Sequence, residues 1–132
     1  MSISIPEKFS DLVSRETRAF TSLALTLSDG TPQVSPVWFD YDGTHFIFNT
    51  ARGRVKDKVM HRHPVVAFSI VDPADPYRYF LVRGRVVDET EEGGYEGICA
   101  LNQKYHGNPD YPKRAETRVI YKVLPEKIFP AK

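Results

Sequence analysis

A strand gives way to a helix within the stretch Thr44-His-Phe-Ile-Phe-Asn-Thr-Ala-Arg-Gly-Arg-Val-Lys-Asp-Lys58. Its first part is rich in β-branched and aromatic residues, which is typical of strands. In its second part the apolar residues Val55 and Val59 are spaced as on one face of a helix. The stretch therefore predicts a strand over residues 45–50 and a helix over about 52–61.

Two further strands precede this stretch, and each is followed by a turn signal. The strand-like run Ala19–Leu27 ends at Ser28-Asp29-Gly30, and the run Gln33–Tyr41 ends at Asp42-Gly43. Asp-Gly pairs favour the tight turns of β-hairpins. The first three strands are therefore expected to form an antiparallel meander.

The rest of the chain supplies three more strands and two more helices. A nearly continuous apolar run predicts a strand buried on both faces, and a glycine inside the longest strand marks a bulge or a close backbone approach. The helices are expected over residues 6–15 and over Glu91–Tyr105, the second despite its early glycines. The strands are expected over Val65–Val71, over Arg78–Asp88, which contains Gly84, and over Thr117–Leu124. A loop over 72–76 separates the first two strands, and Pro125 and a polar tail follow the last one.

Six antiparallel strands with short flanking helices predict a mainly β (α+β) fold. A small barrel is favoured over a doubly wound sheet, because closure removes the edges that an open sheet exposes. The length of 132 residues suits one domain over residues 1–132. No run approaches the ~20 apolar residues of a membrane span, and the first residues lack a signal-peptide pattern. The lone Cys99 excludes an intrachain disulfide and suits the cytoplasm.

Positive charge is concentrated in the predicted helix. Residues 52–62 carry a local charge of +4, whereas the whole chain carries +1, and the cations are Arg52, Arg54, Lys56, Lys58 and Arg62. A helix N-terminus attracts anions, and Gly53 allows a ligand to approach the backbone. We therefore expect a phosphate site here, with a solvated helix face as the alternative. The near-neutral balance disfavours a nucleic-acid partner.

Two other segments are candidates for contacts with a ligand. Along residues 33–39, Gln33, Ser35 and Val37 alternate onto one face and Trp38 lies on the other, while Pro36 frees backbone groups for a ligand. The alternative is an edge strand with a core tryptophan. Tyr77 and Tyr79 could stack on a planar ring, with packing as the alternative.

Other kinds of site are disfavoured. The four histidines have no metal-ligand spacing with Cys or carboxylates, so no metal site is expected. There is no Walker loop, no dinucleotide-binding glycine fingerprint and no Gly-x-Ser-x-Gly element. A nucleotide hydrolase or a nucleophilic enzyme is therefore not expected.

Three segments together resemble a known family. They are Asp29-Gly-Thr-Pro-Gln-Val-Ser-Pro-Val-Trp-Phe39, Asp42-Gly-Thr-His-Phe-Ile-Phe-Asn-Thr-Ala-Arg-Gly-Arg-Val-Lys56 and His63-Pro-Val-Val-Ala-Phe68. The chain is similar to the FMN-binding, pyridoxamine 5'-phosphate oxidase-like (PNPOx-like) split β-barrel proteins over about residues 9–128. It resembles most the branch that uses the deazaflavin coenzyme F-420.

The resemblance implies a set of site residues. Arg54 and Lys56 would hold the cofactor phosphate, with Thr50 and Arg52 nearby. The ring and polyol chain would be lined by residues of the 33–38 segment, namely Gln33, Ser35, Val37 and Trp38. The family forms homodimers with cofactor sites in the interface, so Tyr77 and Tyr79 would reach the ring from the partner chain.

The resemblance also implies a reaction. Reduced coenzyme F-420 would give a hydride to an electron-poor conjugated double bond in a small-molecule acceptor, such as a quinone, enone or lactone. The proton would come from Tyr79 or from solvent. An FMN-dependent oxidase or flavin reductase of the same fold is the first alternative, and a non-catalytic cofactor-binding protein is the second.

Overall fold

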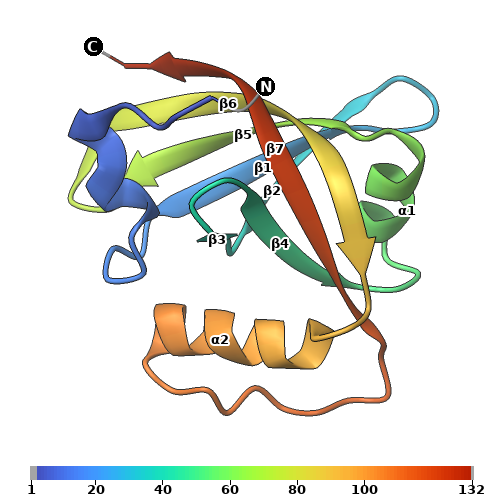
Figure 1. The fold of residues 1–132 in the computed structure, drawn as a ribbon. Coiled ribbons are helices and arrows are strands. Elements are labelled where there is room, and N and C mark those ends of the chain that lie inside the picture. The colour runs from blue at the N-terminus through green and yellow to red at the C-terminus, as the bar shows by residue number, and fades with distance from the viewer. Residues whose placement is uncertain (1–2, 132) are drawn as a thin grey trace.

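The computed structural model describes residues 3–131, and in them the strands form one curled antiparallel sheet (Figure 1). Along the sheet the order is β2-β1-β5-β6-β7-β4-β3. The strands are β1 (Phe20–Thr26), β2 (Pro32–Val37), β3 (Asp40–Tyr41), β4 (Phe46–Ala51), β5 (Val65–Asp72), β6 (Asp75–Thr90) and β7 (Arg118–Pro130). The helices are the 3-10 helix η1 (Glu7–Val13) and the α-helices α1 (Val55–Arg62) and α2 (Gly94–His106).

The sheet has its two edges in neighbouring parts of the chain. β2 and β3 stand at opposite ends of the order, yet Trp38 and Phe39 alone separate them in sequence. Both predicted hairpins are confirmed, since β2 pairs with β1 and β3 pairs with β4. The prediction of one continuous strand over 33–41 is wrong, and so are the three-stranded meander built on it and the count of six strands, since the described residues form seven. The chain breaks at Phe39 because its ring is fully buried in the core.

The core lies inside the curl and is largely aromatic. Phe46 packs against Phe68 at 4.9 Å between ring centroids, and Phe48 packs against the same ring at 5.1 Å. The prediction that β5 is buried on both faces is wrong. Phe68 and its alternate neighbours point inward, whereas Val65 is 53% exposed, so β5 covers the core with one face only.

β6 and β7 are longer than the sequence patterns indicate. β6 begins at Asp75, inside the predicted loop, and β7 runs through Pro125 to Pro130, where a polar tail was expected. A proline is tolerated here because Pro125 lies opposite Gly84, where the register shifts. The close approach predicted at Gly84 is confirmed, because a Cβ there would stand 2.5 Å from Val123 Cγ1.

The helices lie outside the curl, and all three were expected. α1 starts at Val55 rather than Arg52, because the chain first makes a turn in which Gly53 has φ of 91°. Figure 1 shows α2 beneath the end of the sheet formed by β4 and β7. Gly94 allows this packing, since a Cβ there would lie 2.4 Å from the Arg118 carbonyl oxygen. Within residues 3–131 no helix combines the length and the apolarity that a membrane crossing requires.

Candidate functional site

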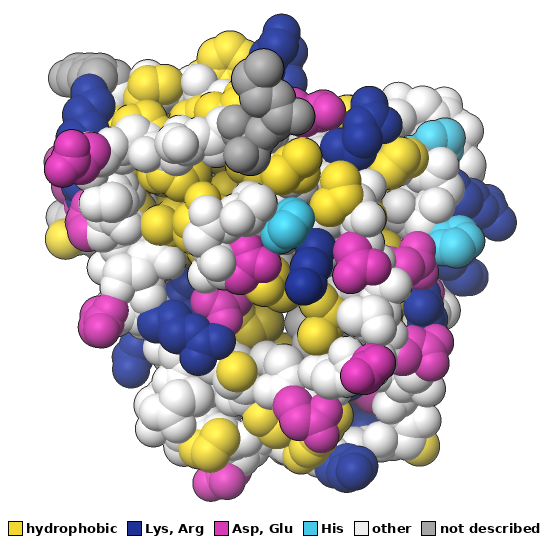
Figure 2. All heavy atoms as spheres, in the orientation of Figure 1, with side chains coloured by type: hydrophobic (Ala, Val, Ile, Leu, Met, Phe, Trp, Pro, Cys, Tyr) yellow, Lys and Arg dark blue, Asp and Glu magenta, His cyan; other side chains and the backbone are white. Residues whose placement is uncertain are grey.

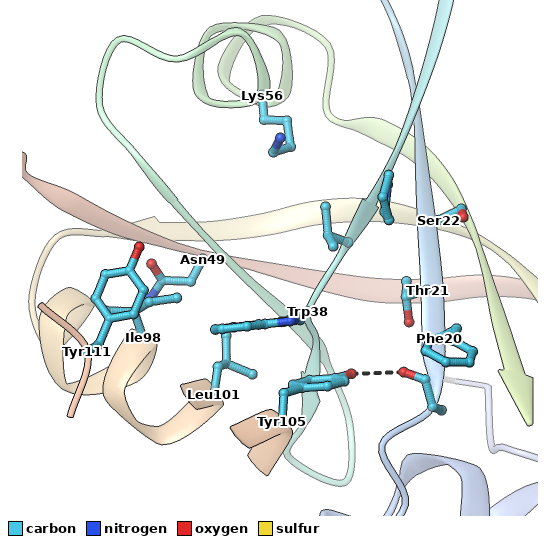
Figure 3. Close-up of a pocket in the computed structure, with 13 residues that line it drawn as sticks. Phe20, Thr21, Ser22, Trp38, Asn49, Lys56, Ile98, Leu101, Tyr105 and Tyr111 are labelled. Atoms are coloured by element: carbon cyan, nitrogen blue, oxygen red, sulfur yellow. Dashed lines mark hydrogen bonds between the residues drawn. The ribbon is translucent and has the colours of Figure 1, made fainter. Parts of the chain in front are cut away.

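A pocket of about 620 Å³ lies between the β1–β2 edge of the sheet and α2 (Figure 3). This volume is in the range of small-molecule and cofactor sites. Its lining is mostly apolar and comprises Ala19, Phe20, Thr21, Ser22, Pro36, Val37, Trp38, Asn49, Lys56, Ile98, Leu101, Tyr105 and Tyr111. The pocket therefore joins the start of β1, the end of β2, the first turn of α1 and one face of α2.

The α2 wall is flat and held in place. The Trp38 and Tyr105 rings stack with centroids 5.4 Å apart and an interplanar angle of 9°. The Tyr105 hydroxyl donates a hydrogen bond of 2.9 Å to the carbonyl oxygen of Ala19, the residue before β1, and so links α2 to the start of that strand (Figure 3). Burial raises the pKa of Tyr105 to about 12, so the hydroxyl stays protonated and keeps donating. This wall is preorganised for a planar ring.

Lys104, on α2, also helps to hold this aromatic wall in place. Its buried ammonium donates to the Phe39 carbonyl oxygen at 2.8 Å and lies 3.8 Å from the centre of the Phe39 ring. Burial lowers the pKa of Lys104 to about 8. Lys104 therefore ties α2 to the break between β2 and β3, and keeps Trp38 next to α2.

Lys56 carries the positive charge at the pocket. It lies in the first turn of α1 and lines the pocket, and no residue of 3–131 forms a hydrogen bond or ion pair with its ammonium. The N-cap residue Arg54 makes no side-chain cap to the helix. The ammonium and the start of α1 are thus both available to an anion, which the helix dipole also favours.

The neighbouring arginines are already paired. Arg52 donates to Asp57 at 2.9 Å, to Glu89 at 2.7 Å and to Glu91 at 2.9 Å, and Arg54 donates to Glu116 at 2.9 Å. Three of these acids, Glu89, Glu91 and Glu116, come from distant parts of the chain. Figure 2 shows Lys and Arg interspersed with Asp and Glu across the middle of the visible face. The local excess of charge in the sequence is therefore offset by the fold.

Asp57 organises the loop that leads into α1. Its carboxylate accepts hydrogen bonds from Gly53 N at 2.9 Å, Arg52 Nη1 at 2.9 Å and the Tyr121 hydroxyl at 2.6 Å. Burial alone would raise the pKa of Asp57, but these donors hold it below its usual value. Asp57 was not among the predicted site residues, because Tyr121 is far away in sequence.

A comparison with protein families identifies the fold. The profile of the family described as pyridoxamine 5'-phosphate oxidase matches residues 5–131. The chain belongs to this family. No curated protein matches the chain.

Solved structures of similar proteins share the fold of this chain. An F-420 reductase from M. smegmatis is 35% identical, covers 94% of this chain and 98% of its own, and has a TM-score of 0.83. HupZ from Group A Streptococcus is 18% identical with a TM-score of 0.68, covering 96% and 93%. The heme storage protein HutZ from Vibrio cholerae is 12% identical with a TM-score of 0.67, covering 97% and 95%. The last two show the fold alone.

The pocket collects some of the residues that the family resemblance implies. Val37, Trp38 and Lys56 line it. Gln33 and Ser35 lie on the half-buried face of β2, outside the lining, and Thr50 is buried nearby in β4.

The two predicted tyrosines lie elsewhere in the protomer. Tyr77 is 82% exposed and Tyr79 is half-buried, both at the start of β6, and neither lines the pocket. Tyr79 pairs with Val71, which pairs with the pocket residue Phe20, so two strand spacings separate Tyr79 from Phe20. The contribution of a partner's tyrosines stays a prediction.

Thr21 is a pocket residue that sequence reasoning missed. It is 3% exposed, on the inward face of β1, and its hydroxyl has no hydrogen-bond partner within residues 3–131. The signal in the sequence was a polar residue two positions before Leu23, where alternation predicts burial. In the same described part of the chain, no cluster of three or more His, Cys, Asp or Glu side chains could hold a metal.

Proposed function

We propose that this protein is a coenzyme F-420-dependent reductase that acts on small conjugated acceptors such as quinones, enones or lactones. The observation that carries the proposal is the likeness to the F-420 reductase, at 35% identity over nearly the full length of both chains. The pocket supports it independently, because its chemistry suits a planar ring that carries a phosphate-bearing chain.

The residues present fit such a cofactor. The stacked Trp38–Tyr105 pair offers a flat aromatic surface for the ring system. Lys56 and the start of α1 would hold the phosphate, whereas Arg52, with its three acidic partners, would act by shaping the loop. Arg54 would have to share its guanidinium between Glu116 and the phosphate. FMN also has a planar ring and a phosphate-bearing chain, so binding measurements have to distinguish the two cofactors.

When bound in its reduced form, the cofactor supplies a hydride to the electron-poor double bond of the acceptor. The chain provides orientation and exclusion of water. Val37, Ile98 and Leu101 supply an apolar surface that desolvates a ring placed against Trp38. The Tyr105 hydroxyl is engaged with the Ala19 carbonyl, so the proton that completes the reduction would come from solvent or from a partner's Tyr79.

We also propose that the protein is a homodimer. A groove of about 540 Å³ on the outer face of the sheet is lined by exposed apolar side chains, including Val34, Leu81 and Phe129. Ser22 borders both this groove and the pocket, so a second copy seated there would lie beside the pocket. Sedimentation equilibrium should show a dimer that Leu81→Glu converts to monomer. A monomeric wild type would refute this assembly.

The central test is a fluorescence titration of cofactor-free protein with oxidised coenzyme F-420 and, separately, with FMN. Micromolar or tighter binding of the deazaflavin with weak FMN binding supports the proposal, and turnover of conjugated acceptors completes it. The reverse preference indicates an FMN oxidase or flavin reductase. Binding of the reduced deazaflavin without turnover of any acceptor indicates a cofactor-binding protein.

A further inference from the structure

Thr21 presents a hydrogen-bonding group that the folded chain does not use. Its hydroxyl lies out of reach of solvent and has no partner in the described part of the chain, although a buried unpaired hydroxyl is unfavourable. Figure 3 shows Thr21 on the β1 wall, across the pocket from Trp38 and α2. The described residues hold two such hydroxyls, on Thr21 and Thr50, and of these Thr21 is the one that lines the pocket, where a bound ligand would supply the missing partner.

We propose that the Thr21 hydroxyl donates a hydrogen bond to a carbonyl oxygen of the conjugated ring bound in this pocket. The inference rests on the proposed reductase function and names the polar contact that fixes the ring in it. Both the deazaflavin ring and the proposed acceptors carry such carbonyl groups, so the chemistry is the same for either source.

The geometry favours a contact with a ring edge. Thr21 pairs with Val37 across the β1–β2 ladder, and Val37 precedes Trp38, the aromatic wall. A ring lying against Trp38 therefore has its edge near β1. For the contact to form, the threonine side chain would rotate between staggered positions so that its hydroxyl faces the cavity that the residue already lines.

The chemistry favours a carbonyl over an anion. The positive charge at the pocket is at Lys56, on α1, whereas the lining next to Thr21 is uncharged and includes Phe20, Ser22 and Val37. A buried neutral hydroxyl discriminates strongly, since a ligand that lacks the matching acceptor leaves it unpaired. Thr21 would thus select ligands with an oxygen at one ring edge.

The experiment compares Thr21→Val, which keeps the shape and removes the hydroxyl, with Thr21→Ser, which keeps the hydroxyl. For each variant we would measure the dissociation constants of oxidised coenzyme F-420 and FMN and the kcat/KM for a conjugated ketone. The thermal midpoint of the ligand-free protein is measured as well. Thr21→Val should raise this midpoint, because it removes an unpaired buried hydroxyl.

Two outcomes support the inference and identify the source of the carbonyl. A roughly tenfold weaker cofactor affinity in Thr21→Val, restored in Thr21→Ser, assigns the contact to the cofactor ring. An unchanged cofactor affinity with a roughly tenfold lower kcat/KM, restored in Thr21→Ser, assigns it to the acceptor.

Other outcomes overturn it. Unchanged affinity and kcat/KM in Thr21→Val, equal losses in both variants, or a lower thermal midpoint for ligand-free Thr21→Val would each do so. In these cases the wild type still binds its cofactor, and the proposed function stands. Failure of the wild type to bind either cofactor would instead refute both proposals.

Discussion

The loop around Gly53 and the pocket differ in whether their polar side chains have hydrogen-bond or ion-pair partners within the described part of the chain. In the loop, Arg52 donates to three carboxylates and Asp57 accepts from three donors. In the pocket, Thr21 and Lys56 have no partner within residues 3–131. The polar groups of the loop are thus paired within the protein, whereas the proposed ligand would supply the partners of Thr21 and Lys56 in the pocket.

Cations that are close in sequence also differ in whether they are paired. Arg52 and Lys56 belong to one turn and the helix that follows it, yet one is fully paired and the other is available. A count of charges along the sequence treats them alike. Only the fold, which brings Glu89 and Glu91 to Arg52, shows which cation can serve an anion.

The largest expected effect is on the stability contributed by the loop around Gly53. Asp57→Asn removes a buried carboxylate that three groups contact, and should lower the free energy of unfolding by about 3 kcal/mol, because the hydrogen bonds to a charged acceptor are lost while Arg52 keeps Glu89 and Glu91. Because the pKa of Asp57 is lowered in the folded state, its contribution is present above the ordinary carboxyl pKa. The gap between wild type and variant should therefore shrink as the pH falls below about 4.

Urea unfolding at several pH values measures this gap. The control is Asp88→Asn, which changes an exposed carboxylate on β6 that has no partner among the described residues. Equal stability of Asp57→Asn and wild type at neutral pH would show that the loop does not depend on this carboxylate.

The second effect is on the pocket and concerns binding rather than folding. Lys56→Met should weaken cofactor binding by about tenfold to a hundredfold, because a charge-assisted phosphate contact is lost. Lys58→Met removes the same charge from an exposed position of α1 outside the pocket, and should have a much smaller effect. Fluorescence titration compares the two, and equal losses would mean that only the overall charge of the helix matters.

The smallest expected effect is on stability and concerns a second buried hydroxyl without a partner among the described residues. Thr50 is buried in β4 without a partner among residues 3–131, and it does not line the pocket. Thr50→Val should raise the free energy of unfolding by about 1 kcal/mol, as measured by urea unfolding. A loss of stability would show that the hydroxyl has a partner in solution. Titration of this variant with cofactor tests whether Thr50 also serves the phosphate.

Sequence patterns predicted the local features of the fold and missed the non-local ones. The Asp-Gly hairpins, both α-helices and the close approach at Gly84 follow from neighbouring residues or backbone freedom. The break at Phe39 and the extension of β7 through Pro125 depend on strands paired across the molecule. A one-dimensional pattern carries no record of such pairing.

The candidate site divides in the same way. Val37, Trp38 and Lys56 were recognised from local motifs, and all three line the pocket. Two of the three acidic partners of Arg52, Glu89 and Glu91, are 37 and 39 residues away along the chain, so this pairing was not visible in the sequence. Thr21 was overlooked because a single threonine in a strand is ordinary until its missing partner is seen in the fold.

The break between β2 and β3 places the chain's single tryptophan, Trp38, in the two-residue link between the edge strands of the sheet and in the aromatic wall of the pocket. Indole emission depends on the surroundings of the ring, and no second indole obscures the signal. One spectroscopic probe therefore reports both the ordering of the link between the edge strands during folding and the binding of a ring in the pocket. Stopped-flow fluorescence can time both events in the unlabelled protein.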